Sequence, residues 1–159
     1  MQNLENKKRM ETWKVQSSDE KGFHKVITPD TCECQEAQMF RLNLSAGESY
    51  TLESKELELH PVLLAGKAKL SGHASLDQDM EKFDSCYIPG NDKLTITAKE
   101  DCIFYIAGAK YEGIGEPHFR KFDITLPIGD VHQIHGEGVG QREVMFTLAP
   151  QDSASKLIC

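Results

Sequence analysis

Alternation of apolar and polar side chains with a period of two dominates the middle of this chain. The clearest case is residues 93–98, where Leu94, Ile96 and Ala98 share one face and two threonines share the other. Successive side chains of a strand point to opposite faces of a sheet, so this pattern predicts a half-buried β-strand. A helical period is weakly present only in residues 76–83. The pattern therefore predicts an all-β protein.

Further strands are predicted at short and regular intervals, with turn residues between them. Gly, Pro, Asn and Asp mark the turns, because they tolerate or fix the backbone angles that tight turns need. Pro61 has no N–H to donate to a strand ladder, so its strand is expected at a sheet edge or a bulge. Strands at this spacing are typical of a β-sandwich or barrel. They are predicted over residues 22–28, 37–44, 50–53, 57–64, 66–72, 73–76, 83–88, 93–98, 101–107, 119–126, 131–135, 141–149 and 156–159.

The length of the chain and the placement of these strands predict one domain. A chain of 159 residues can bury a sizeable core, with little length left for a second domain. Residues 1–21 are polar and show no sustained period, so we expect an N-terminal arm there. Residues 22–159 are expected to form the barrel. Glycine and proline punctuate residues 110–159, which are expected to add extension strands.

Charge and hydropathy argue against nucleic acids and membranes as partners. The formal net charge is -7, whereas a nucleic-acid-binding surface needs a dominant basic face. No apolar run approaches the roughly 18 residues of a membrane span, and the N-terminus has no signal-peptide core, so a cytoplasmic location is expected. The five cysteines are an odd number without repeated spacing, which predicts reduced thiols. The roles of Cys32 and Cys34 stay open.

Several short motifs, in their order along the chain, resemble a known family. The motifs are Thr28-Pro29-Asp30, Leu44-Ser45-Ala46-Gly47-Glu48, Leu63-Leu64-Ala65-Gly66-Lys67-Ala68, Tyr87-Ile88-Pro89, Leu94-Thr95-Ile96-Thr97-Ala98, and the Gly-x-Gly-x-x-x-Arg-x-Val segment ending at Val144. The chain resembles the N-terminal half of 5-deoxy-glucuronate isomerase, the sugar-acid isomerase of inositol catabolism. It is more distantly similar to the deoxyhexosulose-uronate ketol-isomerase. The resemblance implies a cupin-type β-barrel, that is, a double-stranded β-helix or jelly roll.

The resemblance also implies where metal and catalysis would reside. Members of the family have two cupins, with the divalent metal and the isomerase chemistry in the C-terminal one. A metal-dependent cupin holds its ion with a His-x-His pair, a Glu and a further His. The corresponding positions here, counted from the first-motif glycine, are Leu52, Ser54, Glu58 or Leu59, and Leu94. None supplies an imidazole, so the usual metal site is predicted to be absent and no cofactor is expected.

Histidines elsewhere in the chain are the remaining metal candidates. His60 lies near the first motif but has no second histidine within two residues, which favours a structural role. His132 and His135, with His118, are the candidates if a metal is present. Strand residues three apart point to opposite faces, so this pair converges only across a bulge or turn. The alternative is a polar loop near a dimer seam.

Two arginines are candidates for binding an anionic ligand. The guanidinium of Arg142 could hold a carboxylate through two parallel hydrogen bonds, and Arg120 could do the same. The alternative for Arg142 is a salt bridge to Glu143, Glu137 or a neighbouring strand. His132 and His135 are further candidates for ligand contact, whereas no catalytic acid or base can be assigned.

Three functions remain open at this point. The first is a half-length relative of the isomerase family that is inactive alone, either as a split enzyme with a separate catalytic cupin or as a degenerate paralogue. Any activity would be aldose-ketose isomerisation of a deoxy-uronate. The second is a non-catalytic cupin that binds a sugar acid or similar carboxylate through the barrel mouth, and the third is an assembly module. A homodimer is expected, because a lone half would expose an apolar face and the strand edge at Cys159.

Overall fold

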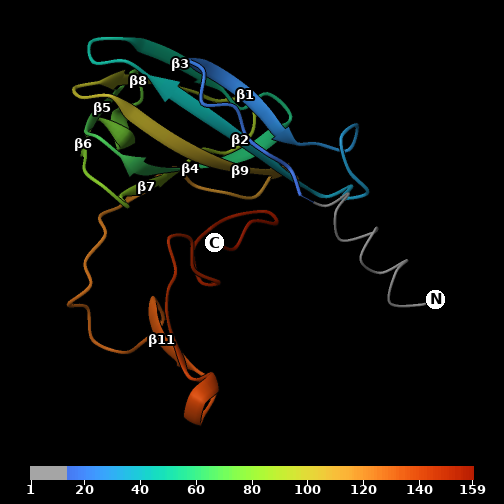
Figure 1. Cartoon of the computed structure of the whole chain (residues 1–159), viewed down its shortest axis with the longest axis vertical. Coiled ribbons are helices and arrows are strands. Elements are labelled where there is room, and N and C mark those ends of the chain that lie inside the picture. Colours follow the sequence, from blue (N-terminus) through green and yellow to red (C-terminus); the bar gives the residue numbers. More distant parts are fainter. Residues whose placement is uncertain (1–13) are drawn as a thin grey trace.

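Two facing antiparallel sheets and a separate hairpin make up the protein (Figure 1). The computed structural model describes residues 14–159, which form twelve strands and two short 3-10 helices. The six-stranded sheet has the order β1-β2-β9-β4-β7-β10, the four-stranded sheet β3-β8-β5-β6, and the hairpin β11-β12. The bounds are β1 Gly22–Ile27, β2 Ala37–Leu44, β3 Ser49–Glu53, β4 Leu57–Ala65, β5 Ala68–Ser71, η1 Ala74–Leu76, β6 Asp79–Met80, β7 Ser85–Tyr87, β8 Lys93–Ala98, β9 Cys102–Lys110, β10 His118–Arg120, β11 His132–His135, η2 Gly138–Gly140 and β12 Arg142–Met145.

The main core lies between the two sheets. Leu42 of β2 lies opposite Phe104 of β9, and Leu70 of β5 lies opposite Ile96 of β8, and all four side chains are fully buried in one cluster. Full burial of such a side chain contributes roughly 1.5–3 kcal/mol. A shift of register by one residue would turn each inward side chain out to solvent, so the core also fixes the strand pairing.

The all-β prediction is confirmed, and the alternation in β8 corresponds to burial of Leu94, Ile96 and Ala98. The weak helical period in residues 76–83 does not give a helix: the 3-10 helix η1 ends at Leu76, and Asp79–Met80 form strand β6. Within residues 14–159, no helix is long and apolar enough to cross a bilayer.

The prediction for Pro61 was wrong. Its strand β4 lies inside the six-stranded sheet, between β9 and β7, and the irregularity in β4 falls between Leu63 and Ala65. The sheet tolerates the proline because the β4–β7 ladder is sparse, with one strand pair, Val62 with Ser85, and an isolated bridge from Leu59 to Ile88. A missing N–H costs little where few ladder bonds form.

The C-terminal third covers the outer face of the six-stranded sheet. Tyr87 and Ala109 of the sheet pack there with Leu148 and Leu157 in a second, smaller apolar cluster. Figure 1 shows this third of the chain, in orange to red, on one side of the two-sheet body. The predicted strand at residues 156–159 is not a strand, although the backbones of Cys159 and Leu148 exchange two hydrogen bonds of 2.9 Å.

The described part of the predicted N-terminal arm packs against β2. Arg41 Nη1 donates to Ser17 Oγ at 2.9 Å, and Asn43 Nδ2 donates to the carbonyls of Ser18 and Glu20 at 3.0 and 2.6 Å. Residues 1–13 of that predicted arm lie outside the described residues.

Candidate functional site

The positions where a cupin holds its metal are apolar and packed in this protein. Leu52 on β3 and Leu94 on β8 lie opposite each other, and Leu59 approaches from β4 of the other sheet. All three side chains are at most 3% exposed and belong to the main core cluster. Ser54 donates its hydroxyl to the Asp92 carbonyl at 3.0 Å.

Glu58 is the alternative to Leu59 at one of these positions, but its side chain bonds to groups on the opposite face of the sheet. Its side chain is fully buried and accepts a 2.7 Å hydrogen bond from the Tyr87 hydroxyl. It also accepts backbone N–H bonds from Ser155, Lys156 and Leu157 at 2.7, 2.6 and 2.9 Å. Four donors thus compensate the buried carboxylate. Three of them are backbone N–H groups of the C-terminal segment, so these hydrogen bonds hold that segment against the sheet.

These residues do not fit a cupin metal. A divalent ion needs imidazole or carboxylate donors, and the leucine side chains offer none. In the part of the chain that the structure describes, no group of three His, Cys, Asp or Glu side chains is placed to hold an ion.

A cavity of about 360 Å³ opens beside Leu52, Ser54 and Leu59. Its deep part is formed by the buried side chains of Phe40, Leu52 and Leu59, and charged side chains stand at its rim. The lining residues are Phe23, Lys25, Gln38, Phe40, Tyr50, Thr51, Leu52, Glu53, Ser54, Lys55, Glu56, Leu57 and Leu59. We call this space the mouth cavity.

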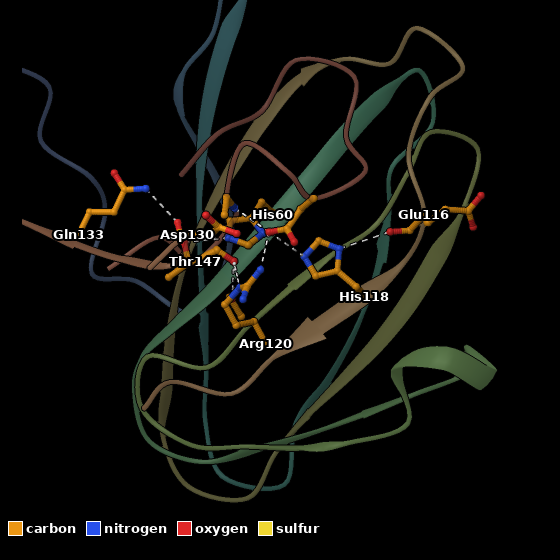
Figure 2. A network of polar contacts seen from close by, with 10 residues as sticks. His60, Glu116, His118, Arg120, Asp130, Gln133 and Thr147 are labelled. Atoms are coloured by element: carbon orange, nitrogen blue, oxygen red, sulfur yellow. Dashed lines mark hydrogen bonds and ion pairs between the residues drawn. The ribbon is translucent and has the colours of Figure 1, made fainter. Parts of the chain in front are cut away.

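A polar cluster lies on the outer face of the six-stranded sheet, under the C-terminal segment (Figure 2). His60 of β4 shares a hydrogen bond of 3.0 Å with the Thr147 hydroxyl. Arg120 of β10 donates Nε to the Thr147 carbonyl at 3.2 Å and Nη2 to the Asp152 carboxylate at 2.5 Å. His118 Nε2 lies 3.9 Å from the same carboxylate. The cluster links two strands to the tail that covers them.

Burial keeps His60 neutral. The side chain is 1% exposed, and this desolvation lowers the pKa of His60 to about 4. The neighbouring His118 and Arg120 side chains also lower the pKa of His60, while the Cys86 carbonyl and the Asp152 carboxylate raise it. Its buried Nδ1 makes no hydrogen bond of good geometry to any group of residues 14–159. A neutral, enclosed imidazole is a structural element of this interface, as the sequence predicted.

Arg120 and His118 are both engaged within the cluster. Burial alone would raise the pKa of Asp152, but the Ala149 N–H and the Arg120 guanidinium lower it on balance. The ring of His118 stacks on Tyr87 at a centroid distance of 5.7 Å. The guanidinium of Arg120 is thus committed to an internal ion pair, which leaves its predicted role in ligand binding without support from the geometry.

The other candidates lie on the β11-β12 hairpin. His132 Nδ1 contacts the Leu126 carbonyl and Nε2 contacts the Glu143 carboxylate, both at 2.6 Å, and these contacts raise the pKa of His132 against the effect of burial. His135 lies opposite Arg142 in the hairpin. Arg142 is exposed and makes no ion pair within residues 14–159, so the alternative of a salt bridge to Glu143 or Glu137 is not observed there. The three candidate histidines are not brought together as metal ligands among the described residues.

The chain has five cysteines. All five are free thiols. Cys32 and Cys34 lie in the loop between β1 and β2 rather than on a strand, and the Cys34 N–H donates to Cys32 Sγ at 3.3 Å.

The sequence did not predict the contacts of three residues at these sites. Thr147 lies in the predicted strand 141–149, whose alternation does not reveal the partner of a polar side chain, and Asp152 lies in the polar stretch after it. Glu58 was weighed only as a metal-position carboxylate, although a charge between leucines of a strand signals a buried acceptor.

Two facing antiparallel sheets around an apolar core are the architecture of a cupin barrel. A model of the KduI/IolB family matches residues 12–159, and the chain belongs to this family. This membership confirms the predicted relationship to the sugar-acid isomerases.

Solved structures share the fold. An IolB-like protein from Salmonella typhimurium is 22% identical with a TM-score of 0.68, over 89% of this chain and 56% of that one. Oxalate decarboxylase from Bacillus subtilis is 16% identical with a TM-score of 0.50, over 60% of this chain and 27% of that one. The chain thus corresponds to 56% of the length of its IolB-like relative. No curated protein matches it.

Proposed function

We propose that this chain is a metal-free cupin of the KduI/IolB family that does not catalyse sugar-acid isomerisation on its own. The observation that carries the proposal is the packing of Leu52, Leu59 and Leu94 at the positions of the cupin metal ligands. An activity of the family kind would need a further cupin to supply the metal and the catalytic groups.

The chemistry of the reaction supports this division. Conversion of an aldose to a ketose moves a proton between adjacent carbons, which needs an acid or base and a group that polarises the oxygens. The leucines of the interior have no proton to transfer. His60 is 1% exposed under the C-terminal segment, so a substrate has no access to its imidazole.

An isomerase assay tests the proposal. The chain is incubated with 5-deoxy-glucuronate and followed by NMR, without added metal and with Mn²⁺ or Zn²⁺, beside a two-cupin member of the family as positive control. We expect conversion at the uncatalysed rate under all three conditions. Conversion that requires the chain and disappears on treatment with a chelator would contradict the proposal.

The same assay distinguishes a split enzyme from a degenerate paralogue. If the chain is half of a split enzyme, adding it to a separately expressed C-terminal cupin of the family will raise the activity of that cupin. If it is a degenerate paralogue, the activity will not change. The expected homodimer and the assembly role stay predictions.

A further inference from the structure

We propose that Cys32, Cys34 and Met39 form a surface site for a soft, monovalent metal ion, Cu(I). All three side chains line one cavity of about 560 Å³ at the loop that connects β1 to β2. None of the three belongs to the main core cluster. The site therefore lies apart from the cupin interior, and it does not depend on whether the chain has isomerase activity.

A turn fixes the backbone at Cys32. The Thr28 carbonyl accepts N–H bonds from Thr31 and Cys32 at 2.9 and 3.1 Å. The Thr31 hydroxyl oxygen in return accepts the Thr28 N–H at 2.8 Å, and Thr28 is buried. The first thiol of the pair thus has a defined place near the end of β1 before any ion binds.

The two thiols can reach one ion. Both are free, and the Cys34 N–H donates to Cys32 Sγ at 3.3 Å, so the first sulfur lies against the backbone of the residue that carries the second. Cys34 is exposed, and rotation about its Cα–Cβ bond can bring its sulfur to the other side of an ion held by Cys32. A metal-bound thiolate carries negative charge, so it accepts such an N–H bond more strongly than a neutral thiol does.

Met39 supplies a third sulfur. It lies opposite Ile27 in the β1–β2 ladder, at the end of these strands where the cysteine loop leaves the sheet. Its side chain is 37% exposed and lines the same cavity as the two cysteines, with Val15 and Ile27 as apolar neighbours. Sulfur ligands in apolar surroundings suit a soft ion that gives up its water shell easily.

The ligand set favours Cu(I) over Zn²⁺. Soft thiolate and thioether ligands select Cu(I), which sulfur sites bind at low coordination number. A structural Zn²⁺ site takes four protein ligands. Within residues 14–159, no further His, Cys, Asp or Glu side chain joins the two cysteines in a group placed to hold an ion. We therefore expect strong binding of Cu(I) and weak binding of Zn²⁺.

Competition with a chromogenic Cu(I) chelator tests the proposal. The chain is reduced, kept under nitrogen and added to the bicinchoninate complex of Cu(I). We expect it to withdraw about one ion per chain, with a thiolate-to-copper charge-transfer absorption in the ultraviolet. An excess of Zn²⁺ should not displace the ion. The Met39 methyl resonance should shift on addition of Cu(I), which locates the site.

Two variants and a control make the test specific. Cys32→Ser/Cys34→Ser should weaken Cu(I) binding at least about 100-fold, because loss of even an outer partner of a metal ligand costs about 10–100-fold. Met39→Leu keeps the side-chain volume but removes the sulfur, and it should weaken binding about tenfold. Cys159→Ser removes a thiol that lies outside this cavity and should leave binding unchanged.

The proposal is overturned if the reduced chain withdraws no Cu(I) from the chelator, or if Cys32→Ser/Cys34→Ser binds the ion normally. Normal binding by Met39→Leu, with an unshifted methyl resonance in the unsubstituted chain, overturns the third ligand. Displacement by Zn²⁺ overturns the selectivity. The proposed function concerns the interior of the barrel, so none of these outcomes changes it.

Discussion

Replacement of Glu58 by glutamine is expected to lower the free energy of unfolding by about 3 kcal/mol. The buried carboxylate accepts hydrogen bonds from the Tyr87 hydroxyl and three backbone N–H groups, at 2.6 to 2.9 Å. A glutamine amide turns an N–H₂ group toward some of these donors, which leaves buried N–H groups without an acceptor. Urea denaturation of the two proteins measures the difference.

The matched control for this prediction is Glu56→Gln. Glu56 is exposed and lies two residues earlier, so its substitution should change stability by no more than about 0.5 kcal/mol. Hydrogen exchange adds a local measurement, because the amides of residues 155–157 should lose protection in Glu58→Gln. Unchanged protection together with an unchanged urea midpoint would mean that this carboxylate does not fasten the C-terminal segment.

Acidification from pH 6.5 to pH 4 is expected to remove up to about 3 kcal/mol of stability through His60. Burial lowers the pKa of His60 from 6.5 to about 4 in the folded protein. Between these values the unfolded chain binds a proton that the folded protein does not, so stability rises with pH. The contribution is complete above pH 6.5 and is lost as the pH falls through the folded pKa.

Other groups titrate in the same range, so a variant must isolate the contribution of His60. His60→Gln keeps a polar group near Thr147 but cannot titrate, and its stability should fall less steeply between pH 6.5 and 4. His24→Gln is the control, because His24 bonds to the exposed Glu20 carbonyl at 2.9 Å. The two imidazoles can also be followed by NMR. If His60 titrates with a midpoint near 6.5, its burial does not persist in solution.

Local sequence patterns predicted the strands in which buried and exposed side chains alternate. The alternation in β8 is visible in a few residues and matches the observed burial. Pro61 misled the prediction, because its tolerance depends on a sparse ladder with β7, a strand more than twenty residues away in sequence. The tail at Leu157 is apolar because it packs on the sheet, not because it forms a strand.

The candidate sites were predictable only in part. The assignment of leucines to the metal positions by counting from a motif stays a prediction, although the structure places Leu52, Leu59 and Leu94 together in the core. The bond from His60 to Thr147 spans 87 residues and the ion pair from Arg120 to Asp152 spans 32, and no local pattern reports such contacts. The sequence assigned an anion-binding role to Arg142, which lies outside the mouth cavity. That role stays a prediction.

The number of metal ions bound per chain is the most direct test of whether the cupin interior lacks a metal site. The chain should be purified without chelators, incubated with Mn²⁺, Fe²⁺ or Zn²⁺, desalted and analysed by inductively coupled plasma mass spectrometry. With Leu52, Leu59 and Leu94 at the ligand positions, we predict fewer than about one ion per ten chains. Retention of about one ion per chain would contradict a metal-free cupin and make His118, His132 and His135 the first residues to substitute.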